Sequence, residues 1–269
     1  MSTIHPLYRS RPVRETLICL HASGSSARQW TGMSAALSAS YRVVAPELLG
    51  YRDEPPWPAG RPVSLDDEAA ALAPLLLANG VHLLGHSYGA TVALQMALLW
   101  PERVKSLTLY EPVRFAVLAH DRGSSAGFED IVGVGRRIGQ DVLAGATATA
   151  SERFVDYWSG EGTWRQMPAR RQQGLVARMP KVRAEFEALF ADRVPLSAYR
   201  ALAVSVHPIG GTAPPAPARQ VLRLLAGQMT QARLTALQGL GHMGPIDAPQ
   251  RVLAALGLSA QEVFQPQAA

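Results

Sequence analysis

Strand-like and helix-like segments alternate along the first 112 residues, and this alternation constrains the fold more than any other feature of the sequence. The apolar, β-rich segments are residues 16–20, 41–45, 81–85 and 106–110. The helix-like segments between them are residues 28–37, 64–78 and 88–100. Because strands separated by helices of about 10–15 residues form right-handed βαβ units, the sequence predicts a parallel sheet buried on both faces.

The alternation stops after residue 112 and resumes near residue 201. Residues 113–200 have an irregular helical pattern that glycine and proline interrupt. Strand-like segments then alternate again with helix-like ones, in the order 202–206, 217–226, 233–237 and 248–256. We therefore expect one α/β core domain, formed by residues 1–112 and 201–269. Residues 113–200 are expected to be a helical lid over the strand ends, where such sheets bind ligands.

The pattern Gly-x-Ser-x-Gly occurs at residues 85–89, between a strand-like and a helix-like segment. A strand that turns sharply into a helix strains the residue at the apex of the turn, here Ser87, and Gly85 and Gly89 leave room for it. The pattern is weak by itself, but its neighbours are the strand and helix that a nucleophile elbow requires. Ser87 is the candidate nucleophile, and the alternative is an incidental serine in a turn.

A serine hydroxyl is a poor nucleophile at neutral pH and needs an adjacent base. Of the seven histidines, His242 lies in a glycine-flanked loop after the last strand-like segment. From there it can reach the sheet edge at which Ser87 emerges, whereas His86 is expected to point away from the Ser87 hydroxyl. His242 is therefore the candidate base, with a solvent-exposed loop histidine as the alternative.

Two backbone N–H groups are expected to bind an oxyanion. Tyr88 follows the nucleophile at a helix N-terminus, and Ser23 lies in the glycine- and serine-rich loop after the first strand. Such groups stabilise the charge of a tetrahedral intermediate without reorganisation. For the Ser23 loop, a plain glycine-rich connection is the alternative.

Composition argues against several other classes of protein. The net charge of +5 comes from scattered arginines without interleaved aromatics, which favours a solvated basic surface over a nucleic-acid interface. No apolar run reaches the roughly 18 residues of a membrane span, and residues 1–15 lack the apolar region of a secretory signal. Cys19 is the only cysteine and excludes an internal disulfide. We expect a cytoplasmic protein without a metal or other cofactor. The sequence leaves open whether the protein forms a homodimer.

Several segments together resemble the α/β-hydrolase superfamily, and most closely its bacterial lid-bearing esterase-like members. They come in the family's order: residues 20–26 with Trp30, 45–51, 85–89, 101–104 and 241–242. The resemblance spans nearly the whole chain. It implies the α/β-hydrolase fold, a mostly parallel central sheet flanked by helices, with a helical lid after the strand that ends at Glu111. One departure is the oxyanion loop, which usually reads His-Gly and here reads His21-Ala22.

The acid of the expected catalytic triad is a further departure. Family members usually carry an aspartate soon after the strand that follows the lid, but residues 201–246 contain no Asp or Glu. Some relatives, certain haloalkane dehalogenases among them, place the acid at the end of the strand after the nucleophile helix. Here that strand ends at Glu111, which is the predicted acid. A strand-end salt bridge is the alternative role for Glu111, and Asp121 and Asp130 are the other candidate acids.

The predicted function is hydrolysis of a carboxylic ester, thioester or lactone through an acyl-enzyme. A C–C bond hydrolase and a cofactor-free perhydrolase resemble the chain equally well, and a non-catalytic ligand-binding protein of the same fold is the alternative from another class. The substrate is expected to be a small molecule that contacts His21 and the lid aromatics Tyr157, Trp158 and Trp164. Packing within the lid would explain any one of these three aromatics about as well.

Overall fold

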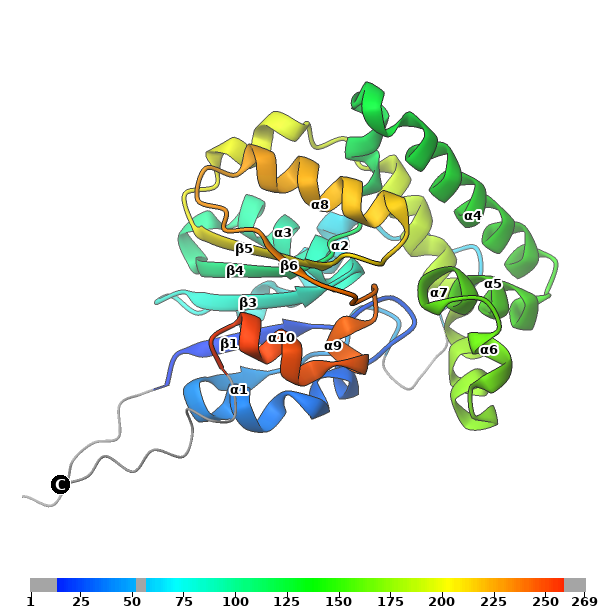
Figure 1. Cartoon of the computed structure of the whole chain (residues 1–269), viewed down its shortest axis with the longest axis horizontal. Coiled ribbons are helices and arrows are strands. Elements are labelled where there is room, and N and C mark those ends of the chain that lie inside the picture. Colours follow the sequence, from blue (N-terminus) through cyan, green and yellow to red (C-terminus); the bar gives the residue numbers. More distant parts are fainter. Residues whose placement is uncertain (1–13, 52–56, 259–269) are drawn as a thin grey trace, which may run out of the picture.

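The computed structural model describes residues 14–51 and 57–258, and within them six strands form one sheet (Figure 1). In sheet order the strands are β2 (Arg42–Val44), β1 (Thr16–Leu20), β3 (Val81–His86), β4 (Val104–Tyr110), β5 (Ser205–Gly211) and β6 (Thr235–Leu237). Every neighbouring pair is parallel. The α/β-hydrolase fold expected from the sequence is confirmed.

Helices cover both faces of the sheet. The helices α2 (Leu65–Leu72), α3 (Tyr88–Leu99) and α8 (Ala216–Gln228) contribute to one apolar core, and α1 (Ser34–Ser40) and α10 (Pro249–Ala255) contribute to the other. Side chains of β1 alternate between the two, with Ile18 and Leu20 in the first core and Leu17 and Cys19 in the second. Burial on both faces explains why the strand is apolar along its whole length.

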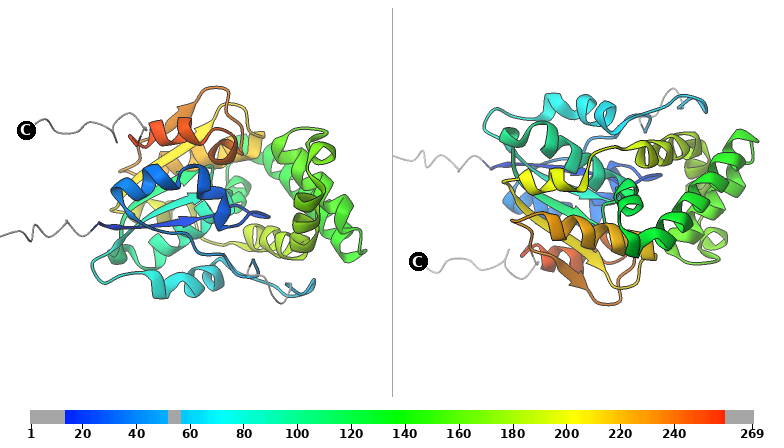
Figure 2. Two further views of the ribbon diagram at one scale, coloured as in Figure 1. Left: turned by 90° about the horizontal axis from the view of Figure 1, so that it is seen from below. Right: turned by 90° about the horizontal axis from the view of Figure 1, so that it is seen from above.

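Residues 113–200, which we call the helical insertion, form a group of helices beyond one end of the strands (Figures 1 and 2). They comprise α4 (Ser125–Leu143), α5 (Thr147–Ser159), α6 (Thr163–Gln166) and α7 (Ala169–Ala191), with short 3-10 turns before α4 and after α7. The helices α4, α5 and α7 pack against one another. Figure 2 shows this group beside the sheet rather than on either of its faces.

The boundaries of β5 differ from the sequence prediction, which ended this strand at Val206 before Pro208. The strand runs from Ser205 to Gly211. Along a parallel strand, successive residues form their backbone hydrogen bonds alternately with the strand on one side and the strand on the other. The Ile209 carbonyl accepts from the Glu111 N–H, so Ile209 bonds on the β4 side. Pro208 therefore faces the β6 side, where regular pairing begins only at Ile209. Val206 also pairs with Ala232 on that side, in an isolated bridge, so the missing N–H of Pro208 interrupts the ladder between this bridge and Ile209.

Two expected helices are shorter than their patterns suggested. The segment 28–37 divides into a 3-10 turn at Ala27–Gly32 and α1, and α2 ends at Leu72, shortly before Pro74. The start of α2 is well defined because Ser64 and Asp67 form a capping box. From this start, α2 places the buried Glu68 in contact with Lys181 of the helical insertion.

Candidate active site

Ser87 lies at the junction of β3 and α3, with backbone angles φ 56° and ψ −118°. A positive φ strains a residue that has a Cβ, and two glycines make this turn sterically feasible. A Cβ on Gly85 would lie 2.4 Å from the Ala90 Cα, and one on Gly89 would lie 2.4 Å from backbone carbonyl oxygens at the end of β1. The structure thus contains the strained turn that the Gly-x-Ser-x-Gly pattern predicts.

The loop between β6 and α9 (Gly244–Asp247) brings His242 to Ser87. Nε2 of His242 lies 2.9 Å from the Ser87 Oγ. Two side chains donate hydrogen bonds to the backbone of this loop. His86 donates from Nε2 to the His242 carbonyl oxygen at 2.8 Å, and the Tyr110 hydroxyl donates to the Gly241 carbonyl oxygen at 2.9 Å. Burial, followed by the neighbouring His242, lowers the pKa of His86 well below 6.5. His86 is therefore a neutral donor that supports the loop.

Glu111 follows β4, and its Oε2 lies 2.7 Å from Nδ1 of His242. The side chain is fully buried, and Oε1 accepts the Gly211 N–H at 2.6 Å. Both carboxylate oxygens therefore have donors when His242 carries its proton on Nδ1. The two other candidate acids are engaged in the helical insertion: Asp121 accepts from the Ser124 hydroxyl and Asp130 from the Tyr157 hydroxyl.

The two expected oxyanion donors lie near Ser87. Tyr88 is the first residue of α3, so its N–H has no acceptor within the helix, while its side chain is buried with the hydroxyl toward Glu68. Ser23 lines the same cavity as Ser87. Within the described parts of the chain, the Ser23 N–H donates to no backbone or side-chain acceptor. Its neighbour Gly24 has φ 68° and donates to the Tyr51 hydroxyl at 2.8 Å, which fixes the loop.

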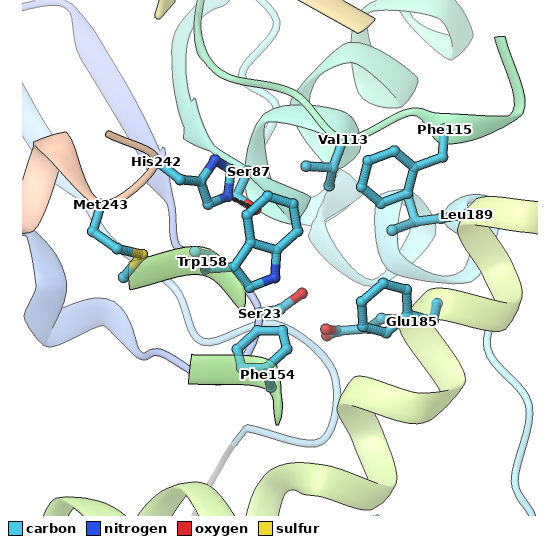
Figure 3. Close-up of a pocket in the computed structure, with 12 residues that line it drawn as sticks. Ser23, Ser87, Val113, Phe115, Phe154, Trp158, Glu185, Leu189, His242 and Met243 are labelled. Atoms are coloured by element: carbon cyan, nitrogen blue, oxygen red, sulfur yellow. Dashed lines mark hydrogen bonds between the residues drawn. The ribbon is translucent and has the colours of Figure 1, made fainter. Parts of the chain in front are cut away.

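A cavity of about 30 Å³ adjoins Ser87 and His242, with room for one or two water-sized groups (Figure 3). Aromatic side chains of the helical insertion form much of its wall. Trp158 of α5 stacks on the His242 ring, with ring centroids 4.0 Å apart and an interplanar angle of 28°. Of the three aromatics expected to contact substrate, Trp158 is the one that the structure places in this wall.

His21, Tyr157 and Trp164, which were also predicted to contact substrate, do not line this cavity. His21 is fully buried, and its Nε2 accepts the Leu48 N–H at 3.1 Å. Tyr157 donates to Asp130 at 2.8 Å, and burial together with this carboxylate raises the pKa of the phenol. Trp164 is partly buried against the main core. These side chains have structural partners that the sequence pattern did not reveal.

Sequence reasoning missed six cavity residues from the helical insertion: Val113, Phe115, Phe154, Glu185, Phe186 and Leu189. Phe154 lies one turn before Trp158 on α5, and Glu185 one turn before Leu189 on α7. Side chains four residues apart share one face of a helix, so the spacing groups them. The spacing does not predict which face of each helix lies against Ser87, because the packing of α5 and α7 decides which face turns inward.

Over residues 14–51 and 57–258, the structure has no group of three or more His, Cys, Asp or Glu side chains arranged to hold a metal ion. None of the helices described there has both the length and the apolar character needed to cross a membrane.

Comparisons with known proteins agree with the fold. Residues 17–255 match the model of the alpha/beta hydrolase family. A hydrolase of Pseudomonas aeruginosa has a similar solved structure, with a TM-score of 0.72 and 21% identity over 92% of this chain and 91% of that chain. At this level of identity the likeness concerns the fold alone.

Two curated relatives match part of the chain. A pimeloyl-(acyl-carrier protein) methyl ester esterase of Aeromonas hydrophila is 37% identical over 100 residues, which cover 34% of this chain and 35% of the esterase. A 2-hydroxy-6-oxononadienedioate/2-hydroxy-6-oxononatrienedioate hydrolase of Pseudomonas putida is 39% identical over 102 residues, or 35% of each protein. The chain thus matches about a third of the length of these relatives.

Proposed function

Because the chain belongs to the α/β-hydrolase family, we propose that it is a serine hydrolase that cleaves a carboxylic ester, thioester or lactone. One observation carries this proposal: Ser87 Oγ, His242 and Glu111 form a continuous hydrogen-bonded chain, with distances of 2.9 and 2.7 Å. The similarity to a methyl ester esterase supports an ester as the substrate among the reactions that this arrangement serves.

In the proposed reaction the Ser87 oxygen attacks the carbonyl carbon of the substrate while Nε2 of His242 takes the hydroxyl proton. Glu111 accepts the Nδ1–H bond, keeps His242 in the required tautomer and stabilises the imidazolium that forms. The N–H groups of Ser23 and Tyr88 bind the developing oxyanion. His242 then protonates the leaving group. The same histidine activates the water that hydrolyses the acyl-enzyme.

The helical insertion acts in this proposal as a lid that selects the substrate. Its side chains Phe154, Trp158 and Phe186 leave a cavity of about 30 Å³, which is too small for most acyl groups. These side chains or their helices therefore move when a substrate enters. The chemistry itself stays with residues of the core domain.

A fluorophosphonate probe tests the nucleophile. We expect Ser87 to be the residue that is labelled, because the hydroxyl is activated by His242. Hydrolysis is measured beside labelling with p-nitrophenyl esters of graded chain length, lactones and acyl thioesters. Ser87→Ala should abolish labelling and lower kcat by about 10⁶-fold, as in other triads that act as a unit.

Two results would contradict the proposal. Labelling of the Ser87→Ala variant would show that another residue is the nucleophile. A wild-type protein that binds esters but neither reacts with the probe nor hydrolyses any of the three substrate classes would instead be a non-catalytic ligand-binding protein of this fold.

A further inference from the structure

Glu185 is the only carboxylate among the described residues that line the cavity. Ser23, Ser87 and His242 also line it and already have roles in the proposed chemistry. Glu185 lies on α7 and is 1% exposed. Figure 3 shows its carboxylate pointing into the same space as the Ser23 hydroxyl, with the Phe154 and Trp158 rings beside it. The wall around it is otherwise largely apolar, so this carboxylate is a distinct polar feature of the cavity.

The two oxygens of Glu185 differ in their surroundings. Oε1 accepts a hydrogen bond from the Lys181 Nζ at 2.8 Å. Oε2 is buried and has no hydrogen-bond partner. A buried acceptor without a donor is unfavourable, and native structures rarely keep one unless water or a ligand supplies the missing bond.

The neighbouring carboxylate, Glu68, has no such unfilled position. Its Oε1 accepts from Lys181 at 2.6 Å and from the Tyr88 hydroxyl at 3.3 Å, and its Oε2 accepts the Leu49 N–H at 3.1 Å. Burial lowers the pKa of Lys181, but Glu185 and Glu68 outweigh this effect and raise the pKa above its ordinary value of 10.5. The Lys181 ammonium therefore stays charged and donates to both carboxylates, while Oε2 of Glu185 is buried beside the cavity without a partner of hydrogen-bond geometry.

Among the protein's own donors, the Tyr51 hydroxyl is the candidate partner of the Glu185 Oε2. It accepts the Gly24 N–H at 2.8 Å. Burial, then the charge of Glu185 and a side-chain contact with that carboxylate, raise the pKa of Tyr51 well above 10, so the phenol keeps its proton. The hydroxyl nevertheless does not reach Oε2 with hydrogen-bond geometry. A donor that enters the cavity therefore competes at Oε2 only with this contact of the Tyr51 hydroxyl, which lacks hydrogen-bond geometry.

We propose that Glu185 is a specificity-determining residue that selects substrates carrying a hydrogen-bond donor, a hydroxyl or ammonium group, on the portion that enters the cavity. The inference rests on the proposed esterase function and narrows its substrate class. A hydroxyl or ammonium group donates to Oε2, whereas a carboxylate at the same place meets a like charge and an acceptor with no proton to share. The aromatic side chains pack against the intervening methylene groups.

Matched acyl chains test this selection. The probes are 1-naphthyl esters of hexanoate, 6-hydroxyhexanoate and 6-aminohexanoate and the 1-naphthyl monoester of adipate, with butanoate and 3-hydroxybutanoate as a shorter pair. The variant is Glu185→Gln, whose amide oxygen still accepts from Lys181 but whose NH₂ group replaces the acceptor Oε2 by a donor. Glu187→Gln is the matched control, because Glu187 lies on the same helix, 51% exposed, and pairs with Arg183.

In the wild-type protein and in Glu187→Gln, kcat/KM should be about 10- to 100-fold higher for the hydroxy or amino ester than for the unsubstituted one, as expected for a hydrogen bond to a charged group. Glu185→Gln should lose this preference and should hydrolyse the adipate monoester better than the wild type does. The labelling rate of Ser87 by a fluorophosphonate should be equal in all three proteins. Equal preferences in the wild type and in Glu185→Gln would overturn the inference and leave the esterase function intact.

A binding measurement separates the two proposals. Calorimetric titration of Ser87→Ala and of the Ser87→Ala/Glu185→Gln double variant with the same esters reports recognition without turnover. Tighter binding of the hydroxy or amino ester, lost in the double variant, supports the role of Glu185 even if the wild type hydrolyses no ester and the proposed function fails. Equal binding of the substituted and unsubstituted esters to Ser87→Ala refutes the role of Glu185.

Discussion

Ser87 and Glu111 are the non-glycine residues of the described chain that have positive φ, 56° and 45°. Such conformations persist only where the surroundings impose them. The N–H of Ser87 donates to the Tyr110 carbonyl oxygen and that of Glu111 to the Ile209 carbonyl oxygen, both at 2.9 Å. The sheet therefore holds both residues by their backbones, and their side chains meet His242 from two adjacent strands.

We predict that Glu111→Gln lowers the activity strongly although it changes the structure little. Glu111→Gln keeps the shape of the side chain but removes the charge that stabilises the His242 imidazolium, so kcat should fall by about 10³- to 10⁴-fold. The free energy of unfolding should change little, because an amide oxygen can still accept the Gly211 N–H. Ester hydrolysis and urea unfolding measure the two quantities.

Asp130→Asn is the comparison for this prediction, because Asp130 was a candidate acid and contacts Tyr157 instead. Its kcat should stay close to that of the wild type. A fully active Glu111→Gln variant, or an Asp130→Asn variant with the larger defect, would mean that Glu111 is not the triad acid.

At the scale of elements, α5 and α7 place one face each against Ser87. The side chains that reach the cavity include pairs one turn apart on both helices, Phe154 and Trp158 on α5 and Glu185 and Leu189 on α7, with Phe186 beside Glu185. Phe115, just before α4, stacks on Trp158 with ring centroids 6.4 Å apart. The wall of the cavity is therefore a packed aromatic layer rather than a loose loop, and a single substitution in it should alter the shape of the site.

Trp158 should affect substrate binding more than chemistry. Trp158→Phe removes part of the surface that stacks on His242 and should raise KM by about 2- to 10-fold, or change the preferred acyl chain length. Ser87 should remain reactive to the fluorophosphonate. The same change at Trp164, which lies outside the cavity wall, should leave both KM and chain-length preference unchanged. If Trp158→Phe and Trp164→Phe behave alike, Trp158 belongs to the packing of the insertion and not to the substrate site.

At the scale of the whole molecule, a buried charged cluster joins the helical insertion to the core domain. Lys181 and Glu185 come from α7, and Glu68 comes from α2. The Lys181 Nζ also lies 5.4 Å from the centroid of the Tyr51 ring and 5.1 Å from that of Tyr88. The insertion is thus anchored by Lys181, which pairs with Glu185 of its own helix and with Glu68 of the core domain.

Lys181→Met should destabilise the protein by about 3–5 kcal/mol, because it leaves two buried carboxylates without their cation. Lys105→Met is the matched control, since Lys105 is partly exposed and pairs with the exposed Glu15; it should change the free energy of unfolding by about 0.2–1 kcal/mol. Urea unfolding at pH 8 measures both. Equal effects of the two substitutions would contradict a structural role of the cluster.

The same cluster gives a pH dependence with a defined sign. The pKa of Lys181 is raised above 10.5 in the folded protein, because its carboxylate partners outweigh burial. Its contribution to stability is therefore complete below about pH 10.5 and is lost as the pH rises through the folded-state pKa. Tyr51 and Tyr88 act in the same direction, because burial raises their pKa values. Unfolding at pH 11 should accordingly show a smaller difference between Lys181→Met and the wild type than at pH 8.

The sequence by itself determined the parallel α/β architecture and the turn at Ser87, because both depend on local rules. Strand–helix alternation implies parallel pairing, and the collision of a Cβ at Gly85 or Gly89 with nearby backbone restricts those positions to glycine. The position of Glu111 at a strand end, and the lack of a carboxylate in residues 201–246, also made it the candidate acid.

Only the tertiary structure decided which side chains form the cavity. Tyr157, Trp158 and Trp164 look equivalent in the sequence, yet only Trp158 meets His242, because the packing of α5 and α7 sets which helix face turns inward. The extension of β5 past Pro208 likewise depends on where β6 begins to pair. The unpartnered oxygen of Glu185 is a product of the same packing, since Lys181 donates to one oxygen each of Glu68 and Glu185. The pairing of Lys181 with Glu68 joins residues 113 positions apart, and no local pattern encodes it.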